Sequence, residues 1–514
     1  MANTAFRTYA KENGGRVSLL FLLFLLSIYE FISAGFPAFA IVCAIPIIVL
    51  VIVGTFRYGM VSFWALIVIN YLVIWHSAPL PSGIPTSMYN EMLEIILITM
   101  AIIDVKNSHF DRLANLMLFA LLLWCGFCTL EVLNDTCGLG INAAAWFQGV
   151  RMMAYQLMYA FIVFTIYISN PKILIKYLYV WGSLALFASF WVWKQKTFGF
   201  TPSESGWLYG AGRVTHIIAG GTLIRYFSIY SDAANFGVGT ASTAVAFLIF
   251  GITSKIKKQK IFFYITGIAC AWAMFPSGTR TAIACMMAGF MAYIFLSKSV
   301  KIAIPVTIFF GLFVFFLAFT KIGQGNQQIR RMRSAFDKSD ASANARTINQ
   351  ETMRKYMAEA PWGIGIGMYG NQVPANNKYR LMSTIPADSE YVFIWLRTGQ
   401  IGITLFLLST AIMLFGACRI VFFTLRSPSL RGIGAGMCCA MVSQQLGGYG
   451  NMVLLQFPNC LVFYGGLAIV YVLPHIENEW DTYEQEQLAL QAEREQRKLE
   501  KKKQSRVKGL FHWT

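Results

Sequence analysis

The chain has 514 residues, of which 56% are hydrophobic and only 13% are charged, and its formal net charge is +18 at pH 7. A soluble domain carries about 25% charged residues, and the apolar residues here form long blocks instead of helix or strand periodicities. These features exclude a soluble enzyme and a nucleic-acid-binding protein. They predict an all-α, polytopic transmembrane bundle whose basic charge must be considered against a membrane.

Apolar segments follow one another along most of the chain. A transmembrane helix needs about 20 mostly apolar residues, and by this rule we expect about 12–14 spans. The first candidate follows Arg7, Lys11 and Arg16, as in a signal peptide, but its apolar run is too long for a signal-peptide core, so we expect it to be retained. The candidates are 17–34, 37–54, 60–76, 87–103, 113–133, 152–169, 177–193, 234–253, 261–276, 281–297, 302–320, 390–415, 432–449 and 452–473.

The distribution of Lys and Arg between the loops predicts the orientation. With the N-terminus inside, the short inner loops hold 14 of these residues, and the outer side, apart from one long loop, holds 7. Since Lys and Arg are enriched in cytoplasmic loops, both termini are expected in the cytoplasm. The expected parts are a bundle over 1–320 with an outer loop at 194–233, an extracytoplasmic loop at 321–389, C-terminal spans over 390–473 and a charged cytoplasmic tail at 474–514.

The long loop at 321–389 carries ten Lys and Arg residues, although topology does not require cations outside. Residues 345–360 are expected to form a helix that ends at the Gly-rich sequence PWGIGIGMYG. The loop is therefore expected to be a folded cap that binds anions. The tail is acidic and then basic, and we expect a charged helix that either binds anionic lipid at the inner leaflet or only fixes the topology.

Motifs for metal or nucleotide chemistry do not occur in the sequence. Cys125 and Cys128 form a C-x-x-C pair, but no second pair or nearby His completes a metal site, and both are expected to be small buried residues. The sequence has no Walker A loop, no H-E-x-x-H and no G-x-S-x-G. We expect no metal and no cofactor. Charges within the spans are few and lie mostly near an end, which argues against an ion-coupled transporter.

Three segments predicted to face outward form a recognisable set. They are TLIRYFSIYSDAANFG with Arg225, PSGTRTA with Arg280, and residues 345–402, which run from ARTINQETMRKYMAEAPWGIGIGMYG to PADSEYVFIWLRTGQIG. In this order, with a large loop before a late span, they resemble the O-antigen polymerase and ligase superfamily. The resemblance implies an integral-membrane glycosyltransferase of the bacterial inner membrane that uses undecaprenyl-pyrophosphate-linked glycans at the outer face, without a metal and with inversion of the anomeric centre.

The resemblance also implies a set of site residues. The arginines of the superfamily match Arg280, Arg346 and, less closely, Arg225, and they would hold the pyrophosphate of the donor. The ligase pattern is His, then Asn, Ser or Gln, nine residues, and Gly-x-x-Gly. Here Asp388 stands at the His position, and Asp388 is the expected group that orients or deprotonates the acceptor hydroxyl. The remaining candidates for substrate binding are Arg354, Glu390 and Tyr391.

Several of these residues can also be interpreted from general physical chemistry, independently of the resemblance. In one continuous helix from residue 388, Gly399 and Gly402 would share a face with Asp388, which would place a carboxylate above two glycines that allow close packing. Asp388 or Ser389 could instead only cap this helix. The arginines could extend to the membrane interface as other outer arginines do. Against this, guanidinium groups stay charged and bind phosphate oxygens in a bidentate manner.

Taken together, these features favour a polymerase of lipid-linked repeat units of a surface polysaccharide. It would transfer the growing glycan from undecaprenyl pyrophosphate to the next lipid-linked repeat, with membrane lipids, a chain-length regulator or a flippase as further partners. An O-antigen ligase, which transfers the glycan to lipid A-core, and a protein O-oligosaccharyltransferase remain alternatives within the superfamily. A transporter of lipid-linked glycans is the alternative from another class.

Overall fold

The computed structural model describes residues 59–78, 85–218, 223–298 and 341–510, together with single residues and short pieces within 15–29 and 304–333. The chain divides into two compact units, residues 1–65 and residues 66–514. In the first unit, the described structure consists of isolated helical residues and the start of α4. The predicted spans 17–34, 37–54 and 302–320 lie wholly or largely outside the described residues, and every element from α5 onward belongs to the second unit.

The described part of the chain is almost entirely helical, which confirms the predicted all-α class. Its only sheet is a hairpin of two strands with two residues each, in which Ile217 pairs with Ile224 in antiparallel register. The helices and strands are α4 (Gly59–Leu72), α5 (Ser87–Ile103), η1 (Phe110–Leu113), α6 (Leu116–Leu130), η2 (Glu131–Leu133), α7 (Ala143–Val150), η3 (Arg151–Tyr155), α8 (Gln156–Tyr167), α9 (Pro171–Phe198), α10 (Pro202–Tyr209), α11 (Arg213–His216), β1 (Ile217–Ile218), β2 (Leu223–Ile224), α12 (Ala233–Thr253), α13 (Lys257–Ala273), α14 (Arg280–Leu296), α16 (Gln327–Arg333), α17 (Ala341–Met357), η6 (Gly370–Gln372), α18 (Arg380–Thr384), α19 (Glu390–Arg419), η7 (Ile420–Thr424), α20 (Pro428–Gly450) and α21 (Asn459–Leu510).

Six helical runs among the described residues are long and apolar enough to cross a membrane, and two shorter apolar helices, Gly59–Leu72 and Arg280–Leu296, accompany them. These findings support the prediction of a polytopic membrane protein. The six runs are Leu116–Leu133, Ala143–Tyr167, Pro171–Phe198, Ala233–Thr253, Glu390–Thr424 and Asn459–Glu500.

Polar residues at the sequence boundaries of the apolar blocks fix where several helices start. Asn115 accepts from two backbone N–H groups of α6, and Asn170 does the same for α9, which has Pro171 in its first turn. Asp232 caps α12 through the N–H groups of Ala234 and Asn235 at 2.8 and 2.9 Å. Such caps satisfy N–H groups that the helix itself leaves without an acceptor, so each apolar run begins at a defined residue.

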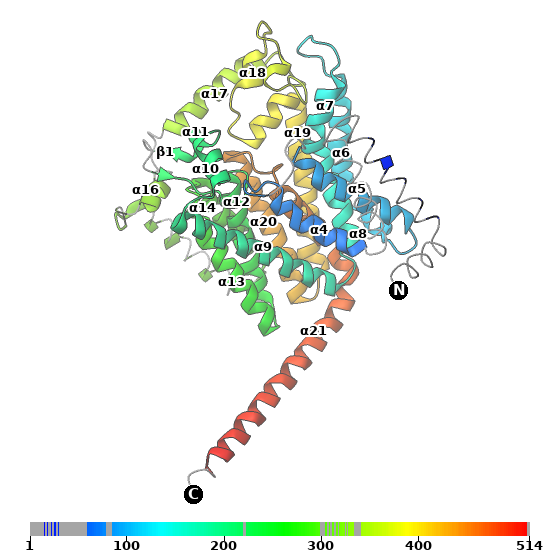
Figure 1. Ribbon diagram of the computed structural model, residues 1–514, viewed down its shortest axis with the longest axis vertical. Helices are drawn as coiled ribbons and strands as arrows, with labels where there is room; N and C mark the ends of the chain where they lie inside the picture. Colours follow the sequence, from blue (N-terminus) through cyan, green and yellow to red (C-terminus); the bar gives the residue numbers. More distant parts are fainter. Residues whose placement is uncertain are drawn as a thin grey trace. The chain divides into compact units, whose positions relative to one another are not determined.

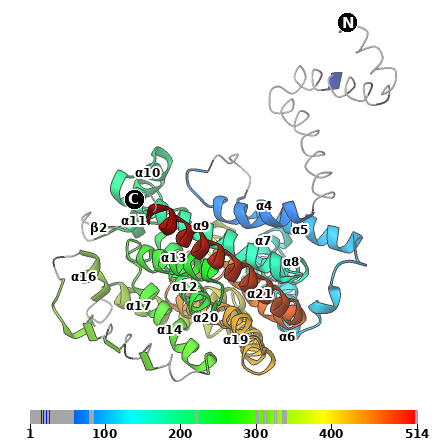
Figure 2. The same ribbon diagram turned by 90° about the horizontal axis from the view of Figure 1, so that it is seen from below.

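Small residues allow the central helices to pack closely. Helix α20 lies against both α12 and α14 (Figure 2). A Cβ atom on Gly436 would lie 2.4 Å from the ring of Phe250 on α12, and one on Gly447 would lie 2.4 Å from Val238. Since lipid tails are as apolar as Leu, association of membrane helices depends on such close van der Waals packing. Around this centre, α13 packs on α9, α8 on α21 and α6 on α19.

Helix α19 is broken near its start, which corrects the expectation of one continuous helix from residue 388. Gly399 has φ 66° and ψ −166°, a conformation essentially restricted to glycine. The Gly-rich sequence after α17 occupies the break, where the N–H groups of Ile364 and Gly365 donate to the carbonyls of Leu396 and Arg397 at 2.9 and 3.1 Å. Asp388, Gly399 and Gly402 therefore do not share the face of one regular helix.

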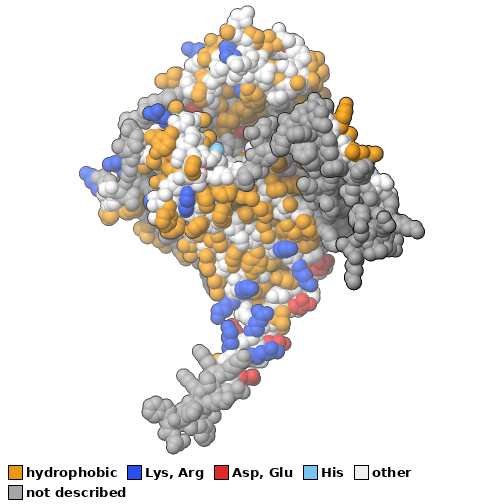
Figure 3. Space-filling view, in the orientation of Figure 1, with side chains coloured by type: hydrophobic (Ala, Val, Ile, Leu, Met, Phe, Trp, Pro, Cys, Tyr) orange, Lys and Arg blue, Asp and Glu red, His pale blue; other side chains and the backbone are white. Residues whose placement is uncertain are grey.

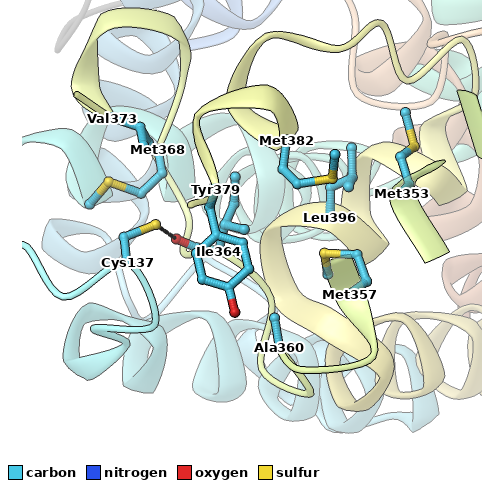
Figure 4. Close-up of a cluster of buried hydrophobic side chains, with 10 residues drawn as sticks. All are labelled: Cys137, Met353, Met357, Ala360, Ile364, Met368, Val373, Tyr379, Met382 and Leu396. Atoms are coloured by element: carbon cyan, nitrogen blue, oxygen red, sulfur yellow. Dashed lines mark hydrogen bonds between the residues drawn. The ribbon is translucent and has the colours of Figure 1, made fainter. Parts of the chain in front are cut away.

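Residues 341–389, named the cap segment here, have a core of their own. The predicted helix at 345–360 is confirmed as α17, which ends before the Gly-rich sequence. Figure 4 shows Met353, Met357 and Met382 beside Leu396 of α19, with Cys137 of the α6–α7 loop donating to the carbonyl of Ile364. The cap segment is thus packed on the start of α19 and on the α6–α7 loop. The buried members of this cluster are Cys137, Met353, Met357, Ala360, Ile364, Met368, Val373, Tyr379, Met382 and Leu396.

The chain leaves the bundle through one long helix. Helix α21 runs from Asn459 to Leu510 and continues past Pro474 without ending there. In Figure 1 its C-terminal half extends away from the bundle at the end opposite α17 and α18. We call these two ends the tail end and the cap end.

The break at Gly399 gives the first prediction. A Cβ atom at this position would lie 2.0 Å from the carbonyl oxygen of Pro361, and the backbone conformation alone would cost about 1–3 kcal/mol. Gly399→Ala is therefore expected to lower the thermal unfolding midpoint of the purified protein and its abundance in membranes. Gly126→Ala on α6, where a Cβ would have no neighbour within 4 Å, is the matched control and should leave both unchanged or raised. Equal stability of the two variants would contradict the described break.

Candidate functional site

The N-termini of α12 and α14 meet at the cap end. The sequence PSGTRTA forms the turn that starts α14, with Gly278 at φ 59°. The Thr279 hydroxyl does not cap α14, and it donates instead to the carbonyl of Ala233, the first residue of α12, at 2.8 Å. Helix N-termini carry partial positive charge and N–H groups that attract anions. Two such ends lie side by side here, because the Thr279 hydroxyl joins the turn before α14 to the first residue of α12.

Arg225 joins the segments around these two helix ends. Its guanidinium donates to the carbonyls of Thr215 and Ser277 at 3.0 and 3.2 Å, and to the Thr279 hydroxyl at 3.1 Å. A guanidinium has five N–H donors, so these three bonds leave two donors unused by the described residues. Arg225 is half-buried, and its three hydrogen bonds hold the turn before α14.

The three predicted arginines are close enough for their charges to interact. Burial lowers the pKa of Arg225; Asp232 raises it, and the charges of Arg280 and Arg346 lower it further. Arg280 is the first residue of α14, and Arg346 is on α17 of the cap segment; both are half-buried. Two guanidinium groups and one carboxylate thus act on a third guanidinium, and the carboxylate is already used to cap α12. Among the described residues that act on Arg225, the result is an excess of positive charge beside two helix N-termini, which suits an anion such as pyrophosphate.

Arg331 is a fourth cation at this place. It lies on α16, and its Nε donates to the carbonyl of Gly278 in the turn before Arg280. The sequence analysis included it only among the ten cations of the long loop. Nothing in its local sequence separates it from Arg330 or Arg333, so its position could not have been predicted.

A buried segment without helical structure lies between α20 and α21. The sequence analysis placed a span over 452–473, but α21 starts only at Asn459, so residues 452–458 correct that boundary. Leu454 and Leu455 are 2% and 7% exposed. Non-helical backbone at membrane depth is tolerated only where protein groups satisfy it. We call residues 451–458 the buried segment.

Side chains from the helix ends around the site bind the buried segment. Glu390 of α19 accepts from the N–H of Leu454 at 2.9 Å and also bonds to the backbone of Val453 and Leu455. On α12, Asn235 donates to the carbonyl of Phe457 at 2.7 Å. Further contacts are Asn451 to Thr281 at 3.1 Å, Ser231 to Gln456 at 2.8 Å and Asn70 to the carbonyl of Pro458 at 3.1 Å. The starts of α12, α14 and α19 are therefore fixed to one segment.

The other predicted site residues fall into two groups. Glu390 is 1% exposed, and the Tyr391 hydroxyl donates to the carbonyl of Gln445 on α20 at 2.9 Å, so both are bound within the bundle. Asp388 and Arg354 are exposed, and neither side chain forms a hydrogen bond or an ion pair with a residue that the structure describes. Asp388 has φ 54° and directly precedes Ser389, the N-cap position of α19.

The capping interpretation does not account for Asp388 or Ser389. Helix α19 has no side-chain cap hydrogen bond, because the Ser389 hydroxyl donates to the carbonyl of Gly448 on α20 at 3.1 Å. Asp388 is one residue before this anchor and two residues before Glu390, which binds the buried segment. Its backbone is thus held from both α20 and the buried segment, while its carboxylate stays exposed.

His216 supports the start of α12 from the 194–233 loop. It is 2% exposed, and its Nε2 accepts the N–H of Ala233 at 2.9 Å. Burial lowers its pKa to about 4, with Arg225 as the next cause, so the ring is neutral as this hydrogen bond requires. His216 was not among the predicted site residues, and only its place before the predicted span at 234–253 hinted at this role.

The lowered pKa of His216 predicts how stability depends on pH. The unfolded chain takes up a proton near its usual 6.5, while the folded chain does so only near 4, so stability should be lost as the pH falls between these values. The loss could reach about 3 kcal/mol. His216→Gln can keep the acceptor without titrating. Its thermal unfolding midpoint should therefore change less than that of the wild type between pH 7 and about 4.5, and identical profiles for the two proteins would contradict this role.

The described geometry defines a helical membrane protein with a cluster of arginines at converging helix N-termini. A family model described as O-antigen ligase matches residues 265–407, which include the turn before α14, the cap segment and the start of α19. A search of curated proteins gives no match. The family match confirms the predicted resemblance to the O-antigen polymerase and ligase superfamily. It indicates a membrane glycosyltransferase of the O-antigen ligase or polymerase type.

Proposed function

We propose that the protein polymerises repeat units of a surface polysaccharide that are linked to undecaprenyl pyrophosphate. The acceptor hydroxyl of the next repeat attacks the anomeric carbon of the growing glycan. The new glycosidic bond forms, the bond between the anomeric carbon and the pyrophosphate oxygen breaks, and undecaprenyl pyrophosphate leaves. The proton of the hydroxyl passes to Asp388.

The arginine cluster is the observation that carries this proposal. The leaving pyrophosphate gains negative charge in the transition state, and preorganised donors aimed at developing charge are a main source of catalysis. In this proposal Arg280 and Arg346 bind the phosphate oxygens in a bidentate manner, and Arg225 adds the two donors that the described residues do not use. The tendency of arginine side chains to extend to the membrane interface does not by itself explain why the segment before α12, the start of α14 and the cap segment each contribute an arginine to the same place.

Asp388 is the proposed acceptor of the proton. Its backbone is fixed next to Ser389 and Glu390, and its carboxylate is exposed at the cap end, where the glycan acceptor could approach. Thr281, which follows Arg280, binds the same buried segment as Glu390. Asp388 and Arg280 are therefore each within two residues of a contact to one rigid element, which supports a shared site. Arg354, Glu390 and Tyr391 remain candidates for substrate binding.

The proposed orientation places this site outside the cytoplasm of a bacterial cell, at the inner membrane. The 14-to-7 distribution of Lys and Arg favours cytoplasmic termini, and the cap end lies opposite the C-terminal half of α21 (Figure 1). Lipid-linked glycan at the outer face would then reach the arginines. A chain-length regulator and a flippase are proposed partners on the same grounds.

Transfer of the glycan to lipid A-core is the second candidate, favoured by the description of the matching family as O-antigen ligase. Deletion of the gene separates the two. Loss of a polymerase should leave surface lipid A-core carrying single repeat units. Loss of a ligase should leave lipid A-core without glycan, while long polymer accumulates on undecaprenyl pyrophosphate. Gels of the surface glycans and of the lipid-linked pool distinguish these outcomes, and the second pattern would overturn the polymerase assignment.

The chemistry assigned to Asp388 gives a prediction for the purified enzyme. Asp388→Asn keeps the size and the hydrogen-bonding capacity of the side chain but removes the base, so polymerisation should fall by about 10²–10⁴-fold with normal membrane abundance. Asp481→Asn, which removes an exposed carboxylate from α21, is the matched control. Full activity of Asp388→Asn would exclude the role. The assay contains lipid-linked donor and a chelator, because inhibition by the chelator would contradict a metal-free reaction.

A further inference from the structure

A groove opens at the tail end between α13 and α21. Its volume is about 540 Å³, and one wall is the start of α13 while the other is the part of α21 just beyond the bundle. The walls are joined by Gln491, which accepts the backbone N–H of Lys257 at 3.0 Å, and by Gln259, which donates to the Tyr483 hydroxyl at 3.3 Å. The shape of the groove is therefore fixed by contacts between two helices that are far apart in the sequence.

Positive charge dominates the lining of this groove. Lys257, Lys258, Arg494 and Lys498 line it, against one carboxylate, Glu495. Lys257 lies 3.8 Å from Glu495, whereas the other three cations form no ion pair with the residues that the structure describes. Figure 3 shows Lys and Arg side chains, with some Asp and Glu among them, where α21 leaves the bundle next to an apolar band on the bundle surface. The groove is thus suited to an anionic group.

The groove is continuous with an apolar stripe on α13. Ile261 is part of its lining, and Ile265, Ile268 and Trp272 follow at spacings of three and four residues, so they share one face of the helix. All four side chains are between 42% and 62% exposed. A soluble anion would make no contact with this apolar stripe, whereas the acyl chains of a lipid would pack along it.

We propose that this groove binds the headgroup of an anionic phospholipid, with its acyl chains along the exposed stripe of α13. Lys258, Arg494 and Lys498 contact the phosphate, and Tyr483 and Leu490 cover the glycerol region. The bound lipid then links α13 to α21 at the membrane surface and holds α21 at a fixed angle where it leaves the bundle. This site is independent of the arginine cluster at the cap end.

The test compares two double variants of the full-length protein. Lys258→Gln with Arg494→Gln removes two groove cations, and Lys106→Gln with Arg419→Gln removes two exposed cations elsewhere. Each protein is incubated with nanodiscs of phosphatidylcholine containing a minor fraction of phosphatidylglycerol, and retained lipid is counted by native mass spectrometry after release into detergent. Each Lys or Arg near a membrane surface contributes about a fivefold factor in binding. The groove variant should therefore retain phosphatidylglycerol roughly thirty-fold more weakly, and the control variant should match the wild type.

Three results would overturn the proposal. These are equal retention by the groove and control variants, equal retention of phosphatidylcholine and phosphatidylglycerol by the wild type, or complete displacement of the lipid by soluble glycerophosphoglycerol, which would mean that the stripe contributes nothing. Ile265→Asn changes only the stripe and should weaken retention without altering groove charge. The thermal unfolding midpoint of each variant, measured without added anionic lipid, checks that the fold is retained, which is expected because the changed cations are exposed.

Discussion

Eight residues of non-helical backbone, 451–458, lie buried between α20 and α21, and the site depends on how their polar groups are satisfied. An unpaired N–H or C=O inside a membrane protein costs several kcal/mol of free energy, roughly as much as the loss of a hydrogen bond in apolar surroundings. The partners come from Glu390, Asn235, Ser231 and Asn70, with Thr281 bound by Asn451. Because these partners lie at the starts of α12, α14 and α19 and on α4, satisfying this one segment also fixes α12, α14 and α19 relative to each other.

The arginine cluster follows from that arrangement. With the starts of α12 and α14 side by side, the turn at 276–280 can be bound by Arg225, and Arg280 necessarily stands at the same point. The cap segment then adds Arg346, and its own position depends on the Gly-rich sequence that fits the break at Gly399. Positive charge is therefore concentrated by backbone geometry, and a polyanionic ligand would relieve the repulsion among the guanidinium groups.

Much of the fold could be predicted from the sequence because long apolar blocks have few alternatives in a membrane. The bounds of α5 equal the predicted 87–103, and α12 and α14 start within one residue of prediction. The break at Gly399 could not be predicted, since it depends on backbone contacts from residues 361–365, more than 30 positions away. The late start of α21 was missed for a similar reason: residues 452–458 are as apolar as a span, and their non-helical form is stabilised by side chains from distant parts of the chain, such as Glu390, Asn235 and Ser231.

For the site, residue type and motif order were informative, whereas positions that act through the fold were not. Arg225, Arg280 and Arg346 were selected because they match the arginines of the superfamily that the motifs resemble, and the structure places them close enough for their charges to interact. Glu390 was predicted to bind substrate, but the sequence does not reveal that the buried segment uses its carboxylate. His216, Arg331 and Asn451 were missed because each contacts a residue in another part of the sequence: His216 and Arg331 bind backbone, and Asn451 binds the Thr281 hydroxyl.

The central claim is that the arginine cluster binds the pyrophosphate of the lipid-linked donor, and calorimetric titration tests it most directly. Undecaprenyl pyrophosphate is titrated into the purified protein in detergent with a chelator present, for the wild type and for Arg280→Lys, Arg346→Lys and the exposed control Arg419→Lys. Lys keeps the charge but loses the bidentate fork, so affinity should fall about tenfold or more at residues 280 and 346 and stay unchanged at residue 419. Unchanged affinity in all three variants would contradict the account.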